Sequence, residues 1–184
     1  MTVIFYHFSE KAELNRLEKR MKKLYISLSQ EKEKSSLNGK IYHYFRDTDP
    51  YYIDTNLETL VFLKNEIQNL KQITKDPSFP EMPAIKQRLN FLMKDNQLSF
   101  SEGMIQKYPY FKETQEIMKH PVELDLNDLH ELLSKIENLT IDQYQPKIKP
   151  PQLLITDFNI ERKICPNKNE VFILTMKILK REYF

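Results

Sequence analysis

Small residues are almost missing from this 184-residue sequence, which contains two glycines, Gly39 and Gly103, and two alanines, Ala12 and Ala84. Loops that cradle phosphate need several glycines, because the backbone must approach the phosphate closely and adopt positive φ angles. Two isolated glycines therefore exclude a Walker-type loop, a dinucleotide-binding fingerprint and a glycine-flanked nucleophile elbow. Lys, Asn, Ile, Leu, Phe and Tyr are abundant in their place, which is typical of an AT-rich genome.

Cysteine is nearly absent as well, and so are long apolar runs. Cys165 is the only thiol, so the chain forms neither an intramolecular disulfide nor a multi-cysteine zinc site. No apolar run approaches the length of a membrane span. Residues 1–8 lack the basic start of a signal peptide, and the sequence turns polar at Ser9. We therefore expect a cytoplasmic, soluble protein with no membrane span.

The composition is otherwise that of an ordinary globular chain. Hydrophobic residues make up 40% of the sequence, aromatic residues 11% and charged residues 29%. This length favours one domain and is sufficient for a core that needs no disulfides or metals. We predict a single domain over residues 1–184, with a helical core over 9–142.

The helical core is predicted from apolar spacing and from capping signals. Residues 14–28 carry apolar side chains at intervals of 3, 4, 3 and 4, which is a narrow seam suited to one neighbouring helix: Leu14, Leu17, Met21, Leu24 and Leu28. Residues 35–39 read as a loop. Capping boxes at Thr55 and Ser99, and Pro83 at a first helical position, predict further helices. Asp125 or Asn127 begins a strongly amphipathic helix.

The two ends of the chain have a different character. Residues 3–8 are apolar or aromatic on both faces, which favours a buried strand. A proline-rich connector over 144–151 leads to a C-terminal β-hairpin over 152–181, whose loop is residues 165–169. The second run of that hairpin also fits a helical period, and we favour the hairpin. The predicted fold is α+β and predominantly helical, a helical bundle with a small antiparallel sheet formed by the N-terminal strand and the C-terminal hairpin.

Charge is unevenly distributed along the chain. The balance is +5 over residues 1–46, −7 over 47–142 and +4 over 143–184. If the two ends pair, a basic terminal lobe faces an acidic helical region, which would favour an acidic partner. The alternative is that solvated helix faces simply carry these charges.

The densest group of potential metal ligands lies around residues 120–131. The spacing of these residues matches no known ligand pattern: His120, Glu123, Asp125, Asp128, His130 and Glu131. Asp125 and Asp128 are better interpreted as acids at a helix start. We predict no metal site, no cofactor and no catalytic residues, although an enzyme whose site assembles from distant residues stays open.

Two short segments are the candidate binding residues. Basic residues cluster within residues 19–23, and aromatic and basic side chains alternate within residues 42–46: Lys19, Arg20, Lys22, Lys23, Tyr42, His43, Tyr44 and Arg46. The alternative for the second segment is a buried aromatic cluster. The leading hypothesis is a non-enzymatic protein-interaction module, such as an adaptor, regulator, chaperone or effector, with a protein partner. The second hypothesis is a nucleic-acid-associated protein that uses the basic lobe.

Overall fold

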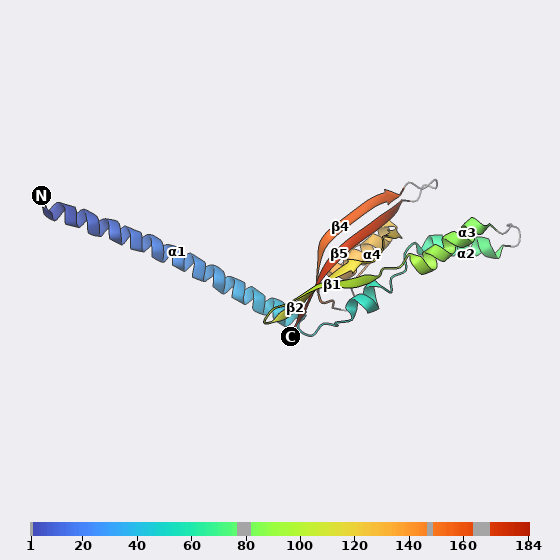
Figure 1. Cartoon of the computed structure of the whole chain (residues 1–184), viewed down its shortest axis with the longest axis horizontal. Coiled ribbons are helices and arrows are strands. Elements are labelled where there is room, and N and C mark those ends of the chain that lie inside the picture. Colours follow the sequence, from blue (N-terminus) through green and yellow to red (C-terminus); the bar gives the residue numbers. More distant parts are fainter. Residues whose placement is uncertain (1, 77–81, 147–148, 164–169) are drawn as a thin grey trace. The chain divides into compact units, whose positions relative to one another are not determined.

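The computed structural model describes residues 2–76, 82–146, 149–163 and 170–184, with side chains from Arg16 onward. It divides into two compact units, residues 1–44 and residues 45–184. We describe each unit by itself (Figure 1).

The first unit is one continuous helix, α1, which spans Thr2–Phe45. No proline precedes Pro50, and 17 of the 44 residues of α1 are the helix-favouring Lys, Glu and Leu. Gly39 lies within the helix, and nothing else approaches the position of a Cβ atom there. The predicted strand at residues 3–8 and the predicted loop at 35–39 are therefore both wrong. Neither segment contains a proline, and the one glycine, Gly39, is tolerated within the helix.

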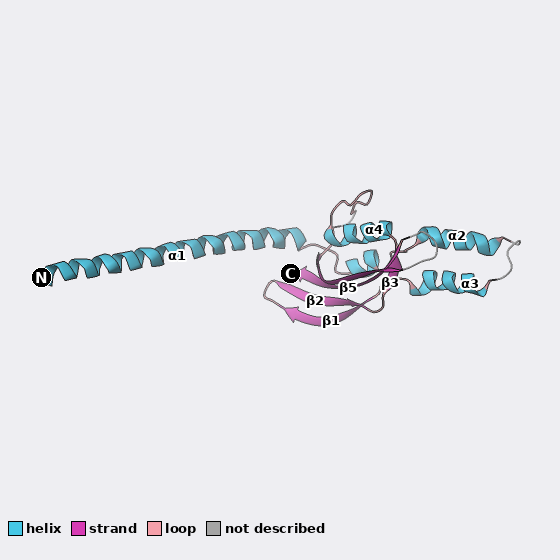
Figure 2. Ribbon diagram, turned by 90° about the horizontal axis from the view of Figure 1, so that it is seen from above, coloured by secondary structure: helices cyan, strands magenta, loops and turns pink. Residues whose placement is uncertain are grey.

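The second unit is built on a five-stranded antiparallel sheet (Figure 2). Its strands are β1 Phe100–Lys107, β2 Phe111–Met118, β3 Val122–Leu124, β4 Gln152–Lys163 and β5 Val171–Tyr183. Strand β5 is central. It pairs with β4 along one edge, and with β2 and then β3 along the other.

This topology confirms the C-terminal hairpin and corrects the rest of the predicted sheet. Strands β4 and β5 pair from Gln152 opposite Arg181 to Lys163 opposite Val171. The predicted loop at 165–169 lies outside the described residues. The sheet is larger than predicted, and its other members are β1, β2 and β3 rather than an N-terminal strand. Strand β4 pairs with one side of β5, and β2 and β3 pair with the other, so no side of β5 is left for an N-terminal strand.

The capping box predicted at Ser99 is wrong, because that segment enters β1 rather than a helix. Strands β1 and β2 form a hairpin in which the Tyr108 amide donates to the Phe111 carbonyl at 2.9 Å. The two rings stack with centroids 4.6 Å apart. Pro109 lies in this turn, where its missing amide hydrogen costs no strand pairing.

The helix predicted from Thr55 is broken in two. A short π-helical turn over Ile53–Leu57, η1, is separated from α2, Lys64–Lys75, by residues 58–63. The break ends at Leu63, whose φ of 53° is left-handed. Helix α3, Pro83–Asn90, begins at its proline as predicted and continues into the π-helical turn η2, Phe91–Asp95.

Helix α4, Leu126–Glu137, confirms the amphipathic helix predicted after Asp125. The Asp125 side chain accepts from the Asp128 amide at 2.8 Å, and Asp128 reciprocates at 3.2 Å, a complete capping box. Leu132 and Ile136 pack with sheet residues that include Leu174 and Ile178. Strands β3 and β4 run parallel on either side of β5, so β3–α4–β4 is a split β-α-β unit.

Helices α2, α3 and α4 therefore accompany a sheet instead of forming the predicted bundle. The main core lies between α4, the sheet and the segment from Tyr52 to Phe62. A second apolar cluster joins Leu63, Ile67 and Leu92 to Val171 of β5. The predicted helical core over 9–142 thus contains three strands, and the α+β class is confirmed.

Candidate functional site

The exposed apolar seam of α1 is the feature of this chain that most clearly lacks a packing partner. Leu17, Met21, Leu24 and Leu28 are exposed by 54%, 70%, 62% and 61%. Each residue of an α-helix turns by about 100°, so these four side chains lie within about 60° of one another on the helix surface. Apolar residues that are singly exposed are normal, but four in register form a continuous seam.

The width of the seam indicates what it fits. A helix that packs on a globular core shows an apolar face wider than about 100°, whereas a two-helix coiled coil uses a narrow seam of a and d positions. The intervals of 4, 3 and 4 from Leu17 to Leu28 match the second pattern. The seam is therefore suited to one further helix.

The predicted basic cluster lies on the same stretch of α1 and points mostly away from the seam. Lys19, Lys22 and Lys23 lie more than about 120° from the middle of the seam, and Arg20 lies about 70° from it. All four are exposed, and no ion pair joins them to another side chain in the part of the chain that the structure describes. Residues 16–28 thus carry a seam on one side and a net charge of +4.

The predicted aromatic patch lies at the other end of the helix. His43 and Tyr44 are exposed, Tyr42 is half-buried, and the rings of Tyr42 and His43 meet edge to face at 5.6 Å. About 28 Å of helix separates Lys23 from Tyr42, at 1.5 Å per residue. The structure therefore does not bring Lys19–Lys23 and Tyr42–Tyr44 into one patch. Arg46 belongs to the second unit, which begins at Phe45.

The basic terminal lobe predicted from paired ends does not form, because the N-terminal strand it required is helical. The basic residues of β4 and β5 form ion pairs within the second unit. Arg181 lies 2.6 Å from Glu113, Lys163 lies 2.5 Å from Glu123, and Lys177 lies 3.1 Å from Asp157. Arg162 and Lys180 pair with Glu170 and Glu116. The positive charge of β4 and β5, which was expected to form a binding surface, is thus largely neutralised by acidic side chains of the same unit.

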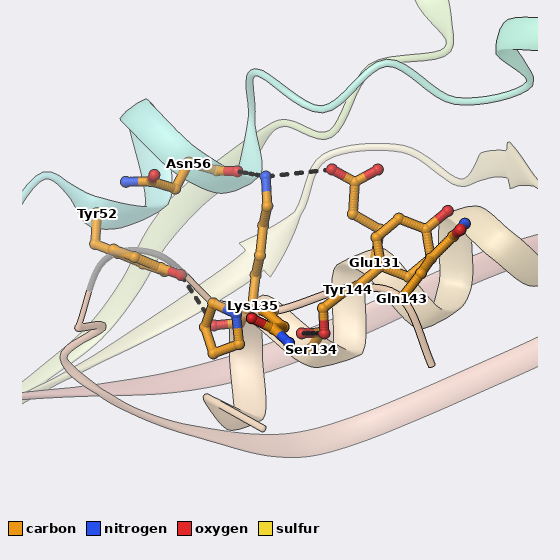
Figure 3. Close-up of a pocket in the computed structure, with 9 residues that line it drawn as sticks. Tyr52, Asn56, Glu131, Ser134, Lys135, Gln143 and Tyr144 are labelled. Atoms are coloured by element: carbon orange, nitrogen blue, oxygen red, sulfur yellow. Dashed lines mark hydrogen bonds and ion pairs between the residues drawn. The ribbon is translucent and has the colours of Figure 1, made fainter. Parts of the chain in front are cut away.

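A polar cavity of about 360 Å³ lies beside α4 in the second unit (Figure 3). Its walls come from η1, α4 and the loop at residues 143–146. The Tyr52 hydroxyl donates to the Lys135 carbonyl at 3.0 Å, and burial raises the pKa of Tyr52 to about 12.

Several polar side chains of this cavity are bonded within the protein, mostly to backbone carbonyls. The Lys135 ammonium lies 3.3 Å from the Asn56 carbonyl and 3.5 Å from Glu131. The Ser134 hydroxyl lies 2.6 Å from the Leu139 carbonyl and 3.2 Å from the Tyr144 carbonyl, and the second contact links the loop to α4. Among the described residues that line the cavity, no nucleophile is paired with a base.

The group of potential metal ligands has structural roles. Asp125 and Asp128 cap α4, and His130 pairs with Asp142 at 2.6 Å. Glu123 lies between Arg88 and Lys163. Within the described ranges, no three His, Cys, Asp or Glu side chains converge as metal ligands do.

The sequence contained the signal for the seam, but the predicted binding residues did not include its leucines. Their spacing predicts packing against a neighbouring helix, but the structure leaves these leucines exposed. None of the helices over the described residues combines the length and the apolar character that crossing a membrane requires.

Comparison with known proteins adds little to this geometry. No protein-family model matches the chain, and no curated protein matches it. Among solved structures, the chain is similar to the type 4 fimbrial biogenesis protein PilO from Pseudomonas aeruginosa, with 15% identity over 66% of this chain and 82% of that chain, at a TM-score of 0.32. A likeness this weak identifies neither the function nor the family of this chain.

Proposed function

We propose that this chain is a non-enzymatic protein-interaction module, and that α1 is the element that binds the partner. One observation carries the proposal, namely the exposed seam of Leu17, Met21, Leu24 and Leu28 on one side of α1. Burying four such side chains against a partner helix would contribute several kcal/mol, at about 25 cal/mol per Å² of apolar surface. In this role the second unit is a folded domain attached to a binding helix.

The absence of an assembled reaction site within the described residues is consistent with this role. The Tyr52 and Ser134 hydroxyls of the cavity beside α4 donate to backbone carbonyls, and the acids around residues 120–131 cap a helix or form ion pairs. Cytoplasmic localisation remains a prediction, as does the contribution of Tyr42, His43, Tyr44 and Arg46 to binding.

Site-specific photo-crosslinking in the cells that produce the protein tests the proposal. A photoreactive residue at Met21 is expected to capture a protein partner, and the same residue at Ile26 is not. Ile26 is a matched control, because it is 55% exposed on the opposite side of the same helix. Leu24→Glu should abolish the capture at Met21. Equal capture at the two positions, or none at Met21, would contradict the proposal.

Nucleic-acid binding is a second candidate, favoured by the unpaired basic cluster at residues 19–23. It predicts an affinity that falls steeply with salt, since each neutralised phosphate releases a counterion. A titration of labelled RNA and DNA at low salt decides this point. Binding that is lost in a variant with all four basic residues changed to Ser would support the second candidate, and a flat titration would reject it.

A further inference from the structure

We infer that the occupant of the α1 seam is an acidic helix of a different protein, rather than a second copy of this chain. This inference rests on the proposed function, because it assumes that the seam binds a helix. It adds the chemical class of the partner, namely a helix with apolar a and d positions flanked by Glu or Asp. It also assigns the four basic residues at 19–23 a part in choosing that partner.

Self-association is disfavoured by where the charge lies. The net charge of +4 over residues 16–28 occupies the same thirteen residues as the seam from Leu17 to Leu28. A parallel copy would place this segment beside itself. An antiparallel copy that buries the same four apolar residues would do so too, because the seam's midpoint lies between Met21 and Leu24.

Charge repulsion between two copies is large enough to oppose the apolar burial that so short a seam provides. Two helices in a coiled coil lie about 8–10 Å apart, which is comparable to the screening length of about 8 Å at physiological ionic strength. Several like charges on each helix are thus only partly screened from those on the other. Stable coiled coils generally extend over at least about three heptads, and the seam from Leu17 to Leu28 covers fewer than two.

An acidic helix changes the sign of the same interaction. Arg20 precedes Met21 and flanks the seam, at the kind of position where coiled coils form ion pairs between helices. Lys19, Lys22 and Lys23 lie farther round the helix and contribute mainly to the local potential. Complementary charge increases the association rate and selects the partner, and apolar burial supplies most of the affinity.

The narrow seam also argues against a lipid surface as the occupant. Helices that lie in a membrane interface have a broad apolar face and often bulky aromatic anchors. Here the seam is about 60° wide at 100° per residue, and Tyr25 is the one aromatic residue within residues 16–28. Anionic vesicles nevertheless belong in the experiment, because a basic helix can be attracted to them.

The test uses the full chain with two synthetic helical peptides as probes. Both have Leu at every a and d position; one has Glu at every e and g position, and the other has Lys. We expect the Glu peptide to bind at least about tenfold more tightly than the Lys peptide, with an affinity that weakens as salt is raised. Arg20→Glu should weaken binding of the Glu peptide about three- to tenfold, more than Lys19→Glu does. Leu24→Glu should abolish it, whereas Ile26→Glu should not.

The alternative outcomes distinguish this inference from the proposed function. If both peptides bind equally well, the acidic-partner inference is wrong and the helix-binding function stands. A dimer of the chain by sedimentation, lost in Leu24→Glu, would also overturn the acidic-partner inference and leave the helix-binding function intact. If anionic vesicles bind and neither peptide does, both are overturned. Circular dichroism of each variant shows that α1 has kept its helical content.

Discussion

Tyr52 is a phenol buried beneath the cavity beside α4, only 2% exposed, with its hydroxyl bonded to the Lys135 carbonyl. Burial disfavours the phenolate, so the pKa of Tyr52 rises from 10.0 to about 12. A pKa raised by folding means that this group's contribution to stability is complete below pH 10 and is lost as the pH rises towards 12. Over that interval the loss is on the order of 2 kcal/mol.

Tyr52→Phe tests this dependence. The variant should be about 1 kcal/mol less stable at pH 8, because the Lys135 carbonyl loses its donor. Its free energy of unfolding should then fall less steeply than that of the wild type between pH 10 and pH 12. Urea titrations at several pH values measure both curves, and parallel curves would show that folding does not raise the pKa of Tyr52.

Asp128 holds the left-handed residue Leu63 in place. Its Oδ2 atom accepts from the Leu63 amide at 2.8 Å and from the Asp125 amide at 3.2 Å. Burial raises the pKa of Asp128, and these two hydrogen bonds oppose that effect. Burial of the Asp128 carboxylate is therefore unfavourable in itself, and its hydrogen bond to the Leu63 amide fixes the start of α2.

Asp128→Ala should lower the free energy of unfolding by about 2–3 kcal/mol, because two amides lose their acceptor and α4 loses half of its capping box. Asp128→Asn is the matched control, since its amide oxygen can still accept, and it should cost less. Chemical denaturation ranks the three proteins. An Asn variant as unstable as the Ala variant would contradict an acceptor role.

At the scale of single elements, Arg88 fastens the α2–α3 hairpin to the sheet. Its guanidinium contacts Glu66 of α2 at 2.8 Å and Glu123 of β3 at 2.7 Å. Burial alone would raise the pKa of Glu123, but hydrogen bonds from Lys163 and Arg88 outweigh it and lower the pKa below 4.5. This ion-pair network therefore contributes stability above that pH, and the contribution is lost as the pH falls below it.

Arg88→Met should cost about 1–2 kcal/mol at pH 7 and make stability less sensitive to acid. The measurement is the free energy of unfolding at pH 7 and pH 3 for both proteins. The difference between them should shrink at the lower pH, because protonation of Glu123 removes its attraction to the Arg88 guanidinium. Lys64→Met is a useful comparison, since Lys64 is 54% exposed and pairs with Glu131 at 3.3 Å. It should change stability by less than about 1 kcal/mol.

Helix α1 should be the least protected helix in the free protein. Its described side chains make little tertiary packing, and helices without packed faces open readily. Hydrogen exchange should therefore be faster over residues 17–28 than over α4, and it should slow when the acidic peptide binds. Slow exchange at residues 17–28 in the monomeric free chain would show that the seam is already covered.

Some elements could be predicted from the sequence and others could not, depending on whether their sequence signals agree with the packing around them. Helix α4 and the hairpin of β4 and β5 were predictable because the capping residue, the period and the bounding turns agree with one another. Strand β1 was not, since Ser99-Phe100-Ser101-Glu102 satisfies a capping rule that the pairing of Phe100 with Met118 overrides. Residues 3–8 carry a strand-like composition, but they continue the helix that the following residues form. The seam of α1 was visible in the sequence, but its exposure depends on packing that spacing does not specify.

At the scale of the whole molecule, apolar burial is concentrated in the second unit. Residues 45–184 contain both apolar clusters, while the described side chains of residues 16–38 are all exposed. Stability should therefore reside in the second unit. We expect residues 45–184 alone to melt cooperatively within a few degrees of the full chain. Calorimetry of the two proteins measures this, and failure of the shorter chain to fold would show that α1 supports the domain.

The central position of β5 also constrains how the protein is made. Strands β2, β3 and β4 all pair with β5, yet all of them precede it in the chain. On the ribosome, where segments emerge from the N-terminal end onward, the β1–β2 hairpin and α1 can form early. The rest of the sheet must wait for residues 171–183, and β4 meanwhile has unpaired edges and the apolar side chains Phe158 and Ile160. Folding of this sheet thus waits for the synthesis of β5, and until then β4 is an unpaired strand of the kind that associates with other chains.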